Sequence, residues 1–192
     1  MEVFWIYFKL GLYHVLDIGG LDHFYFLVVL TLPFMIKEWE KLLIWVSLFT
    51  VGHTISLFSS SFELIKFNGE WTEFLIPITI CITSISAMSS NSKNPVKKSW
   101  FNGISLIFGI IHGFGFGRYF EIIKDENYMI IIPLLEFALG VEFAQIIIVT
   151  FVLMINFLMI KILGLNRKNW QLIISAMVFS QSVSMIAKNW PF

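Results

Sequence analysis

The sequence contains one cysteine, five prolines and few charged residues, and two of these scarcities exclude whole classes of protein. The single Cys81 excludes an internal disulfide and a cluster of thiolate metal ligands within one chain. Only 14% of the residues are charged, compared with about 25% in soluble domains, and the 13 basic and 13 acidic residues cancel. Because the chain has neither a basic patch nor an acidic tail, it is not predicted to bind nucleic acid.

Apolar residues dominate what is present. They make up 57% of the chain, with 21 phenylalanines and 7 tryptophans, and the mean hydropathy is +0.80. This composition predicts an integral membrane protein with a single membrane domain over residues 1–192. The first residues, Met1 to Trp5, lack a basic region and a cleavage site of small residues, so we do not expect a removable signal peptide.

Six apolar stretches are candidates to cross about 30 Å of hydrocarbon, which takes about 20 helical residues. We therefore predict an all-α fold, a polytopic membrane bundle of about six transmembrane helices over Leu21–Ile36, Leu42–Ser60, Phe74–Ser90, Trp100–Gly117, Met129–Ile160 and Trp170–Ala187. The preceding stretch, Phe4–Leu16, is apolar but short and contains Lys9, which predicts a short or re-entrant helix packed on the bundle.

The basic residues of the connecting segments predict the orientation, because cytoplasmic loops of membrane proteins are enriched in Lys and Arg. Alternate connections place eight basic residues on one side: Lys37, Lys41, Lys93, Lys97, Lys98, Lys161, Arg167 and Lys168. The other side has five: Lys9, Lys66, Arg118, Lys124 and Lys188. We take the first side as cytoplasmic and expect both termini outside.

All four histidines lie in apolar stretches, where an ionisable group costs roughly 2.5–3.5 kcal/mol at the centre of an inserted helix. A chain that keeps several such groups is expected to use them. Since successive spans alternate in direction, the predicted topology brings six ionisable residues to the same, outer half of the bilayer: Asp22, His23, His53, His112, Glu136 and Glu142. Imidazole nitrogens and carboxylate oxygens suit zinc, nickel or cobalt, so we predict one shared divalent-metal site.

Three of the N-terminal candidates also have structural explanations. His14 and Asp17 are expected near the membrane interface, where polar side chains are tolerated, and therefore at the rim of the site. Asp22 follows Gly19-Gly20 and could cap the helix that begins there. A cap does not require the adjacent His23, so we favour Asp22, His23 and His14 as metal ligands, with Asp17 supporting them.

The remaining candidates lie in later spans. His53 stands in a small, polar patch, which would also suit a hydrogen-bonded packing role, and the glycines around His112 permit a close approach of another backbone. Glu142 and Gln145 are about 60° apart around a helix, whereas Glu136 points about 120° away from Glu142. We predict His53 and His112 as metal ligands, Glu142 and Glu136 as acid/base residues, and Gln145 as a supporting residue.

Four spaced motifs cover nearly the whole chain in order: Gly11–Phe24, Phe49–Thr54, Phe108–Phe116 and Leu135–Gln145. Together they resemble the HupE/UreJ family. The resemblance implies a nickel or cobalt permease. We expect a multi-pass protein of the bacterial inner membrane, and the sidedness predicted from Lys and Arg puts its metal site in the periplasmic half. The family pattern has a shorter gap than the seven residues that separate His14 from Asp22 here, so zinc, nickel and cobalt all stay open.

The sequence therefore leaves two main functions open. One is a permease for a divalent transition metal. The other is an intramembrane zinc-dependent hydrolase or transferase, with Glu142 or Glu136 as general base and a lipid, lipoprotein or membrane peptide as substrate at the outer leaflet. A metal-sensing or assembly subunit ranks third. The expected partners are membrane lipid, the metal ion or the embedded substrate, and a second copy in a homo-oligomer.

Overall fold

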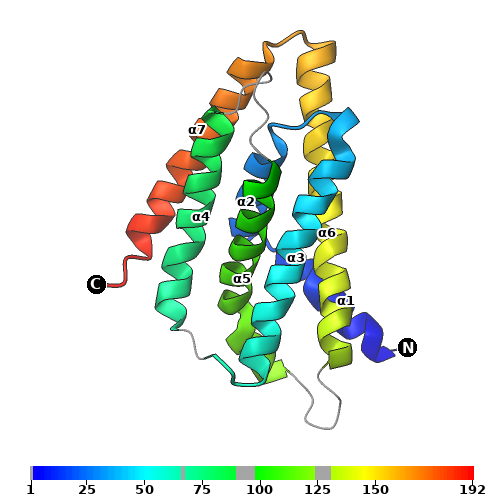
Figure 1. The fold of residues 1–192 in the computed structure, drawn as a ribbon, viewed down its shortest axis with the longest axis vertical. Coiled ribbons are helices and arrows are strands. Elements are labelled where there is room, and N and C mark those ends of the chain that lie inside the picture. The colour runs from blue at the N-terminus through cyan, green and yellow to red at the C-terminus, as the bar shows by residue number, and fades with distance from the viewer. Residues whose placement is uncertain (1, 66–67, 90–97, 124–130) are drawn as a thin grey trace.

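The computed structural model describes residues 2–65, 68–89, 98–123 and 131–192, and the backbone in these ranges forms a bundle of helices with no strand (Figure 1). The helices are α1 (Glu2–Leu16), α2 (Asp22–Thr31), α3 (Trp39–Ser61), α4 (Gly69–Ser89), α5 (Lys98–Ile123), α6 (Ile131–Phe157) and α7 (Arg167–Lys188). A 3₁₀ turn, Ile36–Glu38, precedes α3, and a π-helical turn, Leu158–Ile162, follows α6. The predicted all-α membrane bundle is confirmed.

The predicted count of six spans is not confirmed. Four helical stretches of the described chain are long and apolar enough to cross a membrane: Ile36–Ser61, Gly69–Ser89, Ile131–Ile162 and Arg167–Lys188. The first predicted span, Leu21–Ile36, contains only the 10-residue α2, which is about 15 Å long. The helix ends at Thr31, just before Pro33, which cannot continue a helical hydrogen-bond pattern.

The short N-terminal helix predicted over Phe4–Leu16 is present as the 15-residue α1, about 22 Å long. Helices α1 and α2 are thus two short helices joined by the turn at residues 17–21, where the Gly20 N–H donates to the Asp17 carbonyl at 3.3 Å. His14 lies in the last turn of α1 and His23 is the second residue of α2. The turn therefore brings two histidines to the same place.

Glycines allow α3 and α5 to pack backbone against backbone. A side-chain carbon at Gly52 would collide with the Leu106 carbonyl oxygen, and one at Gly109 would collide with that of Phe49. Such small-residue contacts let membrane helices approach closely. Farther along both helices, Gly113 meets the His53 carbonyl and Gly117 meets the Ser60 hydroxyl, so the two helices run parallel, as Figure 1 shows for the cyan α3 and the green α5.

Helices α1 and α6 cross with the same kind of contact. Gly11 lies against the Phe137 carbonyl and Gly140 against the Phe8 carbonyl, and neither position has room for a Cβ. Helices α4 and α7 form a third pair, side by side in Figure 1. There the Gln171 side-chain amide donates to the Ala87 carbonyl, and Asn189 Nδ2 donates to the Glu73 carbonyl at 3.0 Å.

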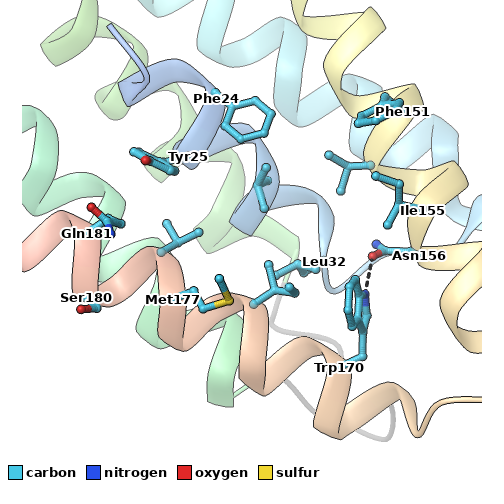
Figure 2. Close-up of a pocket in the computed structure, with 14 residues that line it drawn as sticks. Phe24, Tyr25, Leu32, Phe151, Ile155, Asn156, Trp170, Met177, Ser180 and Gln181 are labelled. Atoms are coloured by element: carbon cyan, nitrogen blue, oxygen red, sulfur yellow. Dashed lines mark hydrogen bonds between the residues drawn. The ribbon is translucent and has the colours of Figure 1, made fainter. Parts of the chain in front are cut away.

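An apolar groove of about 560 Å³ lies between α2, α6 and α7 (Figure 2). Phe24 and Tyr25 of α2 line one end, and Asn156 of α6 and Trp170 of α7 line the other. Trp170 Nε1 donates to Asn156 Oδ1 at 2.9 Å. None of the four histidines is among the lining residues, so this groove is separate from the histidines inside the bundle.

Candidate metal centre

Three histidines from three helices converge inside the bundle. They are His14 of α1, His23 of α2 and His53 of α3, and one ligand nitrogen of each lies within 4.8 Å of the other two. The ring centroids of His14 and His23 are 4.8 Å apart, and that of His53 lies 5.6 Å from His14. The side chains of His23 and His53 are almost fully buried.

Aromatic rings surround this triad. Phe116 lies 4.1 Å from the His14 ring, and Phe137 stacks at 6.1 Å on the His53 ring, both measured between centroids. Phe49 meets the His23 ring edge-on at 6.0 Å. An apolar wall of this kind restricts solvent and strengthens the interaction of an enclosed cation with its ligands.

The Nε2 atoms of all four histidines are buried and have no hydrogen-bond partner among the described residues. Leaving a buried polar atom unpaired costs about 1–3 kcal/mol, so four such atoms point to a ligand that completes them. Zinc, nickel and cobalt all accept imidazole nitrogen. Metal–nitrogen bonds are about 2.1 Å long, so two ligands of one ion lie at most about 4.2 Å apart. A small inward movement of the rings therefore brings the triad to coordination distance.

The carboxylate of Asp22 contacts both the backbone and the ring of His23. Its Oδ1 accepts the His23 backbone N–H at 2.9 Å and lies 3.2 Å from His23 Nδ1. A carboxylate that holds one ring nitrogen in this way directs the other nitrogen, here Nε2, at the metal. The N-cap of α2 is Leu21 and makes no side-chain capping bond, so Asp22 is not the helix cap. The structure thus places this predicted ligand where it would orient a ligand.

His112 of α5 lies next to the triad. Its ring centroid is 5.3 Å from that of His23, and its Nδ1 donates to the Phe108 carbonyl at 2.8 Å, which leaves Nε2 available. The glycine contacts of α5 with α3 explain this position, because Gly113 packs against the His53 carbonyl. His112 is outside the group of three nitrogens, and its role as a ligand stays a prediction.

His14 is only half-buried, whereas His23 and His53 are buried, so it is the most exposed of the three, in keeping with the predicted place nearer the rim. Its ring nevertheless packs against Phe116 and Phe137, because α1 crosses α6. Asp17, in contrast, is exposed and accepts the Gly19 N–H at 2.9 Å. The structure does not bring Asp17 to the triad.

The carboxylates of α6 take different positions. Glu142 Oε1 accepts a hydrogen bond from Ser47 Oγ at 2.6 Å, and its Oε2 accepts one from Thr50 Oγ1. Gln145 Oε1 lies 2.8 Å from the same Thr50 hydroxyl. Glu136 Oε2 is buried and has no hydrogen-bond partner within the described part of the chain. Neither glutamate belongs to the group of three nitrogens.

Sequence reasoning did not connect Ser47 and Thr50 with Glu142. A signal is present, because Ser47, Thr50 and His53 follow one another at three-residue spacing and so share one face of α3. That face meets α6.

Comparison with known proteins adds the family. The sequence model described as HupE/UreJ protein matches residues 1–192. The chain belongs to the HupE/UreJ family. The family resemblance predicted from the four motifs is therefore confirmed. Comparison with curated proteins and with solved structures finds no significant match. This HupE/UreJ-family chain is a membrane protein with a histidine cluster that can hold a metal ion.

Proposed function

We propose that this HupE/UreJ-family protein binds a divalent transition metal, nickel or cobalt, at His14, His23 and His53 and transports it across the membrane. One observation carries the proposal: three histidines from three helices bring one ring nitrogen each within 4.8 Å of the others, and their buried Nε2 atoms have no hydrogen-bond partner among the described residues. An ion that crosses the bilayer needs replacement ligands for its water, and imidazoles supply them. We place the site in the periplasmic half of the bacterial inner membrane.

The arrangement of the helices supports a transported ion. His14 and His23 flank a turn between two short helices, and broken helices of this kind form ion sites in transporters. The turn itself is exposed, whereas the side chain of His23 is 2% exposed. The ion therefore reaches the triad only when the helices around it move. Movement of α1 or α2 alone would open the site, since each carries one ligand.

The test combines metal content with uptake. Purified protein is loaded with Ni²⁺, washed and analysed for metal, and proteoliposomes containing a trapped nickel indicator report uptake. His53→Phe keeps an aromatic ring of similar size against Phe137 but removes the nitrogen, so we expect it to lose both bound nickel and uptake. Thr83→Val is the matched control, because Thr83 is a buried residue of α4 whose hydroxyl donates only within its own helix, to the Thr79 carbonyl.

Two results would contradict the proposal. Wild-type protein without stoichiometric nickel or cobalt, or His53→Phe protein with unchanged metal, would remove the metal site. Metal that stays bound while the proteoliposomes show no uptake would remove transport and favour the zinc-dependent hydrolase. In that enzyme Glu142 or Glu136 would be the acid/base residue, and a Glu142→Gln variant would keep the metal and lose hydrolysis of a membrane substrate.

A further inference from the structure

Next to the histidines, α3 and α6 carry a second polar cluster whose chemistry differs from that of the triad. Its members are Ser47 and Thr50 of α3 and Glu142 and Gln145 of α6, which we call the oxygen cluster. Side-chain oxygens from both helices meet there: Ser47 Oγ lies 2.6 Å from Glu142 Oε1, and Thr50 Oγ1 lies 2.8 Å from Gln145 Oε1. The triad offers nitrogen, whereas this cluster offers oxygen.

The oxygen cluster has more acceptors than its hydroxyl protons can serve. Thr50 has one hydroxyl proton, yet the Val46 carbonyl at 3.3 Å, a Glu142 oxygen and Gln145 Oε1 all lie within its reach. The Glu142 carboxylate is the strongest acceptor of the three, so Gln145 Oε1 then faces the Thr50 oxygen with no proton between them. Either a positive centre among these oxygens or a reversed Gln145 amide would relieve this contact.

Turning the Gln145 amide around relieves the contact at Thr50 but leaves the other end of the amide without a partner. Its oxygen and nitrogen are assigned from the hydrogen-bond pattern, so the reversed amide would donate from Nε2 to Thr50. The unpartnered atom would then be Oε1 in place of Nε2, which as placed has no partner among the described residues. Gln145 is fully buried. In either orientation one buried end of the Gln145 amide lacks a partner among the described residues.

The position of the oxygen cluster relates it to the triad. Thr50 precedes His53 by three residues, which is about 4.5 Å along the same helix. Phe137 stacks on His53 and Glu142 follows it by five residues on α6, about 7.5 Å along that helix. An ion that leaves the imidazoles toward the N-terminal end of α3 thus meets the oxygen cluster next. Conduction needs sites that bind strongly enough to admit an ion and weakly enough to release it.

We propose that Ser47, Thr50, Glu142 and Gln145 form a second cation site, with oxygen ligands, that receives the divalent ion from the histidines. This inference rests on the proposed transport function. Glu142 supplies the negative charge, and the two hydroxyls and the amide oxygen supply neutral ligands that suit hard cations such as Mn²⁺. Nickel binds imidazole nitrogen more tightly than neutral oxygen ligands, so the oxygen cluster is the weaker of the two sites for nickel. A weaker second site favours onward release of the ion.

The experiment uses two metal probes on the purified full-length protein. Ni²⁺ reports the triad, and Mn²⁺, which prefers oxygen ligands, reports the oxygen cluster through its electron paramagnetic resonance signal during titration. We expect Glu142→Gln to weaken Mn²⁺ binding at least about tenfold, because the charge of the ligands sets affinity at such sites, and to leave Ni²⁺ binding at equilibrium unchanged. We expect His53→Phe to do the reverse. Thr83→Val should change neither.

A second variant guards against damage to the fold. Thr50→Val is close in volume and removes only the hydroxyl, so we expect weaker Mn²⁺ binding and slower nickel uptake with nickel affinity retained. Mn²⁺ binding that is unchanged in both Glu142→Gln and Thr50→Val would overturn the second site and leave the cluster as a contact between helices. Wild-type protein that binds Mn²⁺ through Glu142 but no Ni²⁺ would instead overturn the proposed function at the triad. The two failures are therefore distinguishable.

Discussion

Helix pairs α3–α5 and α4–α7 hold their members together in different ways. In α3–α5, Gly52, Gly109 and Gly113 each lie against a carbonyl of the opposite helix, and His53 and His112 are buried beside them. In α4–α7, side-chain amides donate to carbonyls of the opposite helix, and no described histidine is present. Two of the four histidines thus lie where the backbones of α3 and α5 come closest.

The difference has a physical reason. Side chains on a glycine-lined face cannot fill the interface, so the helices are held at a fixed, short distance, and residues beside the glycines keep one position. A metal site needs ligands fixed to within fractions of an ångström, which long, flexible side chains between two helices do not provide. The α4–α7 pair, whose contacts are made by such side chains, is suited to a supporting role.

The largest expected effect comes from breaking the glycine contact itself. In Gly109→Ala, the new methyl group would meet the Phe49 backbone, which cannot rotate away, so we expect a loss of about 3 kcal/mol of stability and loss of bound nickel. Thermal unfolding in detergent measures the loss of stability, and metal analysis measures the loss of bound nickel.

The matched control for this change is Gly103→Ala in the same helix. Gly103 has no atom within 4 Å of the added carbon, so alanine there should be neutral or stabilise the helix by about 0.5–1 kcal/mol. If Gly109→Ala and Gly103→Ala unfold at the same temperature and bind the same amount of nickel, the close approach of α3 and α5 does not hold the site.

Much of this arrangement follows from the sequence. Composition and segment length are sufficient to predict an all-α membrane bundle, and the alternation of spans predicts that His23 and His53 come to the same half of the bilayer. The structure brings these two histidines together. The direction of each span, and the half of the bilayer in which a residue lies, follow from counting residues along the helices, which a single sequence permits.

Other features depend on contacts that counting does not reveal. The stretch Leu21–Ile36 is apolar enough to suggest a full span, but hydropathy does not show that α2 ends at Thr31. Counting also does not show that the His14 ring packs against Phe116 and Phe137, because the crossing of α1 over α6 depends on Gly11 and Gly140, which are far apart in sequence. The bonds from Ser47 and Thr50 to Glu142 likewise join residues more than 90 positions apart.

An intermediate effect is expected from changing the site without changing the packing. Asp22→Asn keeps the size of the side chain but removes the charge that holds His23 Nδ1, so we expect metal affinity to fall about 10-fold to 100-fold with little change in unfolding temperature. Asp17→Asn is the control, since Asp17 is exposed and bonds only within its own turn. Calorimetric titration with Ni²⁺ measures the nickel affinity of both variants. If the two variants bind nickel equally, Asp22 does not orient the ligand.

The smallest effect should come from the α4–α7 pair. Gln171→Met keeps the length of the side chain but removes the amide that donates to the Ala87 carbonyl, so we expect about 1 kcal/mol less stability. Nickel binding should stay at the wild-type value, because Gln171 lies on the pair that carries no histidine. Unfolding and metal titration on the same sample separate the two properties. A Gln171→Met protein that loses nickel while remaining folded would mean that α4–α7 transmits its packing to the triad, and the division between a site-bearing pair and a supporting pair would have to be abandoned.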